Sequence, residues 1–242
     1  MSSASGSPPQ LSGPGILQTF VSIPQSSQLA EDTLLQFLDN VYTPALIETG
    51  VVESVRRYKA ANPAYDKQHM IVYNVPDLAP LLAGKLQKVP RTSETFPTNG
   101  PVEDFVEFES RIFSLAQVYQ TVEHPEDATT TIIYAAMETQ PGGEADLEAW
   151  YQEEHNQQMS EQPGWKRTVR YSLLTQYRPD GKDAQRMSFL AIHEFGEGHK
   201  LGQDVAPLDP ITDWTKKCMS EAKAIDAAIY EKVKVFGKVA GS

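Results

Sequence analysis

One cysteine, Cys218, stands among the 242 residues, so the chain holds no internal disulfide, no iron–sulfur cluster and no zinc site built from thiolates. Long apolar runs are missing too, since no segment approaches the about 20 apolar residues of a membrane-spanning helix. Basic residues are in deficit, with 21 Lys and Arg against 32 Asp and Glu and a net charge of −11. Nucleic acids and anionic membranes bind through basic surfaces, so neither is an expected partner.

The N-terminal segment, residues 1–14, is rich in Ser, Gly and Pro and has neither a basic start nor an apolar stretch. This composition predicts a disordered tail rather than a signal peptide. Together with the low cysteine content it favours a reducing compartment, and the cytoplasm is the expected location.

Several sequence motifs that would define a reaction are also missing. The chain has no His-x-x-x-His or His-Glu-x-x-His pair, no Gly-x-Gly-x-x-Gly opening a helix, no phosphate loop and no Gly-x-Ser-x-Gly. These absences weigh against a zinc hydrolase, a dinucleotide enzyme and an α/β-hydrolase. A reaction without metal or organic cofactor is the simpler expectation.

The chain does contain an internal duplication. A shift of 113 positions lays three residues of the first copy, Tyr42, Arg57 and Tyr58, on His155, Arg170 and Tyr171 of the second. A shift of 117 lays residues 70–73 on 187–190 and residues 111–119 on 228–236. A repeat of this length indicates a duplicated domain, because solenoid repeats run at about 20–50 residues.

The order of predicted elements is the same in both copies, residues 15–121 and 130–238: strand, helix, strand, strand, helix, strand. Strands are predicted at 15–23, 51–58, 70–75 and 105–119, then at 130–137, 165–177, 187–195 and 227–236. Helices are predicted from residue 32 to Pro44, which should end or kink the first of them, and at 78–86, then at 146–159 and 212–224. This order is ferredoxin-like. Two such sheets each leave an apolar face uncovered, so an α+β fold with both repeats in one intramolecular barrel is predicted. The long segment 88–104 is predicted to be a loop, which either covers an active site or has no functional role.

The second copy resembles the EthD-like branch of the dimeric α/β-barrel superfamily. The resemblance lies in Glu154-His155 on an aromatic helix, the Pro163-Gly164-Trp165 turn, the Arg170-Tyr171 strand and the segment 189–195. The first copy departs from it, with Tyr42 in place of histidine and residues 50–52 reading Gly-Val-Val. The resemblance implies the barrel fold, but the superfamily includes cyclases, decarboxylases, cofactor-free monooxygenases, haem proteins and members without known activity.

His155 is the leading candidate for chemistry. It lies four residues after Tyr151, so the two side chains share one face of a helix. An imidazole near its ordinary pKa of about 6.5 is a usable base, and the tyrosine would orient it or bind a substrate oxygen. The alternative is a histidine that packs on the sheet or bonds to backbone.

The remaining candidates each have a structural alternative as well. Arg57 and Arg170 would hold a carboxylate or enolate oxygen, or pair with the many carboxylates of the chain. His193 would join the site if its strand face meets the same cavity, and it or His155 would be the axial ligand if the protein bound haem. Further substrate contacts are predicted at residues that would otherwise belong to the core: Trp150, Trp165, Tyr134 and Tyr42.

These residues predict a cofactor-independent enzyme acting on a polyketide- or terpenoid-like carbonyl compound. His155 would remove a proton next to the carbonyl, while Tyr151 and Arg170 hold the enolate oxygen. Cyclisation, dehydration and isomerisation can begin this way, and decarboxylation passes through a similar enolate. Two alternatives stay open: a cofactor-free monooxygenase, and a non-catalytic ligand-binding or stress-associated barrel. The expected partner is a small molecule, and the expected assembly a monomer or homodimer.

Overall fold

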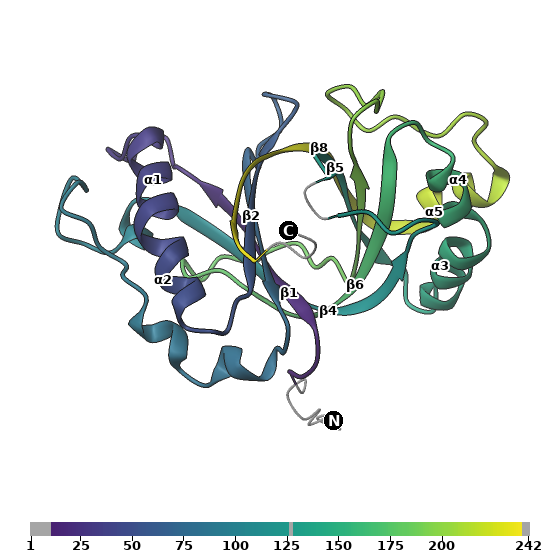
Figure 1. The fold of residues 1–242 in the computed structure, drawn as a ribbon. Helices are drawn as coiled ribbons and strands as arrows, with labels where there is room; N and C mark the ends of the chain where they lie inside the picture. The colour runs from purple at the N-terminus through teal and green to yellow at the C-terminus, as the bar shows by residue number, and fades with distance from the viewer. Residues whose placement is uncertain (1–10, 126–127, 239–242) are drawn as a thin grey trace.

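Eight strands close into one antiparallel barrel in the computed structural model, which describes residues 11–125 and 128–238 (Figure 1). Their order around the barrel is β1-β3-β2-β8-β5-β7-β6-β4. The first four are β1 (Gly15–Ser22), β2 (Ser54–Ala60), β3 (His69–Val75) and β4 (Glu107–Tyr119). The second four are β5 (Thr131–Thr139), β6 (Trp165–Tyr177), β7 (Phe189–Phe195) and β8 (Ala222–Gly237).

Each half has the ferredoxin-like strand order, with its fourth strand beside its first, then its third, then its second. The halves join where β2 pairs with β8 and where β4 pairs with β6, so the second strand of each half meets the fourth strand of the other. Both seams lie within one chain. The predicted fold of two tandem repeats in one intramolecular barrel is confirmed.

Strand residues alternate between the barrel interior and the helices. On β1, Ile16 and Phe20 belong to the cluster inside the barrel, whereas Leu17 and Val21 pack beneath the helices of the first half. On β5 the same alternation sends Tyr134 inward and Ile133 outward. The helix-facing side of the second sheet is therefore the surface that any site near His155 must share.

Strand pairing corrects part of the internal alignment. Tyr58 pairs with Met70, and its counterpart Tyr171 pairs with Leu190, so Met70 corresponds to Leu190 and not to Met187. The predicted shift of 117 is wrong for this strand, because β6 is longer than β2 and the connection after it is longer too. The corrected shift is 120. The match of Arg111 with Ala228 agrees with the pairing, since both lie opposite equivalent residues of β1 and β5.

The first helix of each half contains a π turn at the same place. In the first half α1 (Glu31–Phe37) continues through a π turn (Leu38–Tyr42) into α2 (Thr43–Glu48). In the second half α3 (Glu144–Trp150) continues through Tyr151–His155 into α4 (Asn156–Ser160). The two π turns are related by the shift of 113. Single π turns inside α-helices often occur at functional sites.

The second helices of the two halves differ. The predicted helix at 78–86 is replaced by two short 3-10 turns, Ala79–Leu82 and Lys85–Lys88, because Gly84 between them adopts a left-handed φ of 73°. In the second half α5 (Asp213–Glu221) is a true helix, capped by the Thr212 hydroxyl, and β8 follows it directly. The predicted C-terminal turn of that helix, at 222–224, belongs to the strand.

The long segment after the 3-10 turns fills the first half. A third 3-10 turn, Val102–Asp104, lies near its end. Phe96 packs against Phe37 with ring centroids 4.8 Å apart and against Phe105 at 5.5 Å. Phe37 is equivalent to Trp150 at the shift of 113. The space beside the helix of the first half is therefore occupied by aromatic side chains.

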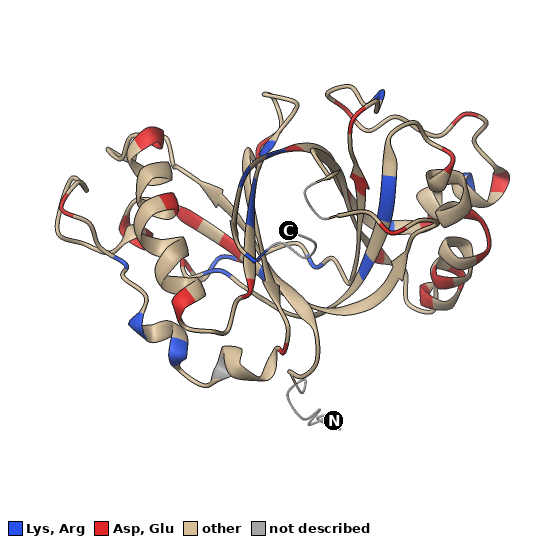
Figure 2. Ribbon diagram, viewed as in Figure 1, with Lys and Arg blue, Asp and Glu red and all other residues tan. Residues whose placement is uncertain are grey.

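Part of the N-terminal segment belongs to the core of the first half, and the charges divide between helices and strands (Figure 2). Of the predicted tail at residues 1–14, residues 1–10 lie outside the described residues, whereas Leu11 is buried in the core of the first half. Acidic side chains lie on the outward helices of both halves, and several Lys and Arg lie on barrel strands (Figure 2). Within the described ranges no helix has the length and apolar character needed to cross a bilayer.

Candidate functional site

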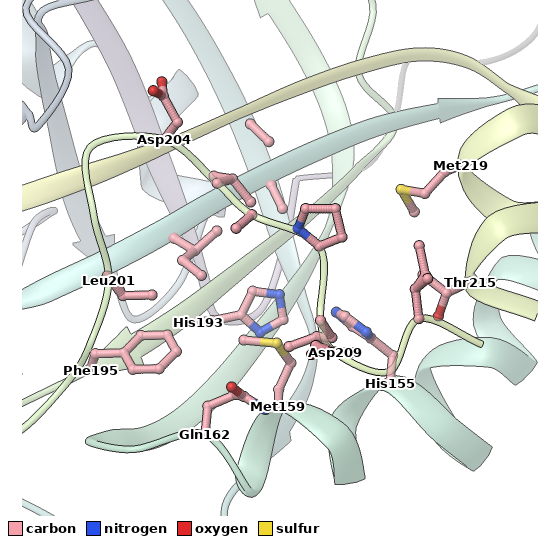
Figure 3. Close-up of a pocket in the computed structure, with 18 of the residues that line it drawn as sticks. His155, Met159, Gln162, His193, Phe195, Leu201, Asp204, Asp209, Thr215 and Met219 are labelled. Carbon is pink, nitrogen blue, oxygen red and sulfur yellow. The ribbon is translucent and has the colours of Figure 1, made fainter.

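A cavity of about 750 Å³ lies in the second half, between the first helix, the helix-facing side of the sheet and the segment 200–211 (Figure 3). Apolar side chains form most of its wall, among them Ile133, Met137, Met159, Phe195, Val205 and Met219. His155 enters from the helix and His193 from β7. The volume is within the about 300–1,000 Å³ of small-molecule sites.

The π turn brings the polar side chains of the helix to this cavity. The Asn156 N–H donates to the Tyr151 carbonyl, five residues back, which widens the helix by one residue. Trp150, Tyr151 and His155 all line the cavity as a result. The equivalent residues of the first half are Phe37, Leu38 and Tyr42.

Three aromatic rings surround the His155 imidazole. Its ring stacks on Trp150 with centroids 4.1 Å apart, meets Tyr151 edge-on at 5.2 Å, and lies 5.4 Å from the His193 ring at 78°. The His155 Nδ1 atom is buried and has no hydrogen-bond partner among the described residues. Nδ1 of His155 is thus enclosed by protein, and only Nε2 is open to a ligand.

A second helix holds Trp150 in place. The Trp150 indole N–H donates to the Thr215 hydroxyl at 3.1 Å, and the Thr212 hydroxyl donates to Glu154 Oε1 at 2.6 Å. Thr212 caps α5, and Thr215 lies in its first turn. The surface on which His155 stacks is therefore fixed by hydrogen bonds between α3 and α5.

Burial keeps both imidazoles neutral. Desolvation, followed by the positive charge of Arg170, lowers the pKa of His155 to about 3. Desolvation, His155 and Arg170 lower the pKa of His193 well below its ordinary value. The predicted base near pKa 6.5 is thus corrected, because a cation in this apolar cavity is stabilised only if a negative charge forms beside it.

Tyr151 offers the cavity a hydroxyl group. Burial raises the pKa of Tyr151 to about 12, so it is protonated at neutral pH. None of the described residues forms a hydrogen bond with this hydroxyl. The Arg170 guanidinium lies over the Tyr151 ring, 4.1 Å from its centroid.

Arg170 and Arg57 each form an ion pair with a carboxylate of the first helix in their own half. Arg170 donates to Glu148 at 3.1 and 2.5 Å and to Gln117 at 3.1 Å, and it does not line the cavity. Arg57 donates to both carboxylate oxygens of Asp39, at 3.0 and 2.9 Å. Of the two predicted roles of these arginines, the structure contains the ion pair. The Arg170 guanidinium also packs against the Tyr151 ring.

The structure brings together four of the nine predicted site residues: His155, Tyr151, Trp150 and His193. The other predicted contacts lie elsewhere. Trp165 packs on Tyr119 and Phe195 beside the cavity, and Tyr134 lies inside the barrel, where its hydroxyl accepts from Arg111 at 2.7 Å. Tyr42 and Arg57 belong to the filled first half.

Sequence reasoning missed the segment that closes the cavity. Residues 200–202, 204–209 and 211 all line it. A long connection without regular structure inside a compact domain is the signal that would have indicated them. Among the described residues, no three His, Cys, Asp or Glu side chains lie close enough together to hold a metal ion.

Comparison with known proteins gives similarity of fold only. No family model matches the chain, and no curated protein matches it in sequence. The solved structure of an anthrone oxidase-like protein superposes over 95% of this chain and 94% of its own, with a TM-score of 0.56 at 12% identity. This match shows a shared fold and nothing further.

Two Listeria proteins match more loosely. A monooxygenase-like protein from Listeria innocua is 13% identical over 91% of this chain and 95% of its own, with a TM-score of 0.40. A ferredoxin fold protein of Listeria monocytogenes, related to antibiotic biosynthesis monooxygenases, is 14% identical over 91% and 96%, also at 0.40. Membership of the EthD-like branch stays a prediction.

Proposed function

We propose that the protein is an enzyme that removes a proton next to the carbonyl group of a bulky, mostly apolar small molecule. The observation that carries the proposal is the convergence of two neutral imidazoles and a free hydroxyl on one apolar cavity. Such a cavity binds a hydrophobic substrate by burial, and a few polar groups fix its orientation. A polyketide- or terpenoid-like compound has this combination of apolar body and carbonyl group.

His155 is the proposed base. A pKa of about 3 reflects the cost of placing a lone cation in this cavity. Proton transfer from a substrate carbon would create an imidazolium and an enolate together, so the pair is neutral overall and the two charges stabilise each other in low dielectric. The driving force is therefore present only when a substrate of sufficient carbon acidity is bound.

The protonated Tyr151 hydroxyl is a proposed donor to the substrate oxygen. Its free hydroxyl and its position one turn from His155 support this role. Arg170, which sequence analysis assigned to the same oxygen, would act by holding the Tyr151 ring. Cyclisation, dehydration and isomerisation can all begin with this proton removal.

Reaction of the deprotonated substrate with oxygen is the second candidate. The Arg170 guanidinium is paired with Glu148 and does not line the cavity, so it would not bind the enolate oxygen directly. An enolate whose oxygen is not paired with a guanidinium keeps more electron density and gives up an electron to O₂ more readily. The fold match to an anthrone oxidase-like protein suggests anthrone as a probe.

Hydrogen–deuterium exchange tests the proposal without requiring the natural substrate. The protein is incubated in D₂O under nitrogen with anthrone, 2-tetralone and cyclohexanone, and deuterium uptake next to the carbonyl is measured by mass spectrometry. We expect accelerated exchange with at least one of the larger probes and a loss of at least 100-fold in His155→Gln. The matched control is Tyr42→Phe, at the equivalent position of the filled half, which retains the wild-type rate.

The outcome separates the alternatives. Exchange under nitrogen together with oxygen consumption in air identifies the oxygenating reaction. Probes that bind but exchange no faster than without protein would show a binding protein instead and contradict the proposal. Equal acceleration in wild type and His155→Gln would exclude His155 as the base.

A further inference from the structure

Three side chains of the second half, Trp165, Thr168 and His193, form a hydrogen-bonded relay. The Trp165 indole N–H donates to the Thr168 hydroxyl at 3.2 Å, and the same hydroxyl lies 2.8 Å from His193 Nδ1. Thr168 is 0% exposed and His193 is 2% exposed, so no bulk water reaches the Thr168 hydroxyl.

Counting hydrogens fixes the direction of the relay. Indole nitrogen is only a donor, and a hydroxyl has one proton to give. If Thr168 also accepted from His193, its own proton would be buried without an acceptor, since the described residues offer the hydroxyl no third partner. Such a loss costs about 1–3 kcal/mol. Thr168 therefore donates to Nδ1.

The relay determines which nitrogen of His193 carries the proton. Nδ1 accepts from Thr168, so in the neutral ring the hydrogen is on Nε2. Burial lowers the pKa of His193 well below its ordinary value, which keeps the ring neutral. His193 lines the cavity, and no described residue bonds its Nε2. His193 thus presents a hydrogen-bond donor to whatever occupies the cavity.

We propose that His193 donates through Nε2–H to the substrate's carbonyl oxygen, and that Thr168 and Trp165 are positioning residues that fix this tautomer. The proposal rests on the proposed function for its substrate. It divides the roles of the two imidazoles: His155, whose Nδ1 has no neighbour to fix a tautomer, accepts the proton, and His193 stabilises the oxygen.

The distance between the rings suits this division. Their centroids are 5.4 Å apart. A carbonyl oxygen and the carbon next to the carbonyl are about 2.4 Å apart from bond lengths and angles, so one substrate lying in the cavity against both rings can present its carbon to His155 and its oxygen to His193. A neutral imidazole that polarises a carbonyl beside a separate base is established chemistry for enolate formation.

The first half contains none of the relay. Val55 pairs with Tyr73 as Thr168 pairs with His193, and Val52 is equivalent to Trp165 at the shift of 113. The relay therefore occurs only in the half with the open cavity. Its three polar side chains are not a requirement of the fold.

Nitrogen spectroscopy tests the tautomer directly. The chain has five histidines, so long-range ¹H–¹⁵N correlation of the ¹⁵N-histidine-labelled protein is simple to assign, with His193→Gln identifying the His193 signals. We expect a protonated Nε2 and a bare Nδ1 at pH 7. Thr168→Val keeps the side-chain shape but removes the hydroxyl that donates to Nδ1. His193 should then show a mixture of tautomers or the opposite tautomer. A protonated Nδ1 in wild type, or no change in Thr168→Val, overturns the proposal.

Binding of 9-fluorenone tests the role toward the substrate. This ketone has no hydrogen next to its carbonyl, so it cannot react. We expect its carbonyl stretch to fall on binding to wild type and to Tyr73→Phe, the matched control in the first half, but less in Thr168→Val. No fall in wild type, or equal falls in all three proteins, contradicts the donor role.

The two proposals fail differently. If the tautomer and the fluorenone shift are found but no probe exchanges deuterium, His193 is a carbonyl donor in a binding protein and proton removal is excluded. If exchange depends on His155 while Nδ1 of His193 is protonated, the enzyme proposal stands and the relay is refuted.

Discussion

The His155 ring lies 4.1 Å from the Trp150 ring, and the two planes are only 20° apart. The indole covers one face of the imidazole and excludes water from it. Because hydration is what normally stabilises an imidazolium, this stacking contributes to the low pKa of His155. Burial against Trp150 is thus part of the desolvation that keeps His155 neutral.

Stability should fall at mildly acidic pH because of this histidine. The unfolded chain binds a proton at His155 below about pH 6.5, whereas the folded chain does so only near pH 3. Unfolding therefore takes up a proton between these values, and the free energy of unfolding decreases as the pH falls. At pH 5 the loss from His155 is about 2 kcal/mol relative to pH 7.5. Urea denaturation at both pH values measures it.

His155→Gln is the control for that measurement, because glutamine does not titrate. The variant should lose about 2 kcal/mol less than wild type between pH 7.5 and 5. Equal losses in the two proteins would show that His155 titrates normally in the folded state.

Replacing Arg170 should affect ligand affinity through its contact with the Tyr151 ring and protein stability through its ion pair with Glu148. Arg170→Met and Arg57→Met each break a helix-to-strand pair with a carboxylate, so each should lower the free energy of unfolding by about 1–3 kcal/mol. Only Arg170 lies over an aromatic ring of the cavity. We expect fluorenone affinity to weaken several-fold in Arg170→Met and to stay unchanged in Arg57→Met. Equal effects on affinity would contradict the supporting role.

Gly164 should tolerate no side chain. Its φ is +76°, and a Cβ there would lie 2.5 Å from the His199 backbone nitrogen. The Gly164 carbonyl also accepts from Gly196 N–H at 2.8 Å, at the start of the segment that closes the cavity. Gly164→Ala should cost about 3 kcal/mol or more through strain and clash.

Gly181→Ala is the matched comparison for Gly164→Ala. Gly181 has a φ of +71° but open space around it, so its replacement should cost only about 1 kcal/mol. Thermal denaturation of both variants gives the comparison. Similar costs would mean that close approach to His199 is unimportant.

Removing the Phe96 ring, which packs beside the helix of the first half, should destabilise the protein without creating activity. Phe96 is buried between Phe37 and Phe105, so Phe96→Ala should lower the free energy of unfolding by about 3 kcal/mol. The exposed Tyr177 provides a control, since Tyr177→Ala should change it by less than about 0.5 kcal/mol. The new space holds tyrosines rather than imidazoles, so deuterium exchange should stay at the wild-type rate.

Sequence alone predicted the fold because two independent signals agreed. The duplication fixed the number of units, and the order of strands and helices fixed their type. The alignment failed at β3 and β7, where Met70 matches Met187 by residue type but Leu190 by pairing. Lengths of strands and connections change freely at barrel ends, so residue identity there is a weaker guide than register.

The site was predicted only in part. His155, Tyr151 and Trp150 come from one helix, where spacing reveals a shared face. Thr168 and the segment 200–211 reach the cavity only through tertiary folding, and the π turn has the same residue pattern as an ordinary helix. The pKa of His155 was misjudged for the same reason, because it depends on Trp150 stacking and on burial beneath segments distant in sequence.

The two seams between the halves, β2 with β8 and β4 with β6, have a consequence for how this barrel exists in the cell. A barrel made from two separate chains opens when dilution separates them. Here the partner sheet is supplied by the same polypeptide, so closure is independent of concentration. A replacement in one half is also not copied into the other, as it would be in a symmetric pair. The first half is thus a permanently attached scaffold whose side chains can change without altering the cavity of the second half.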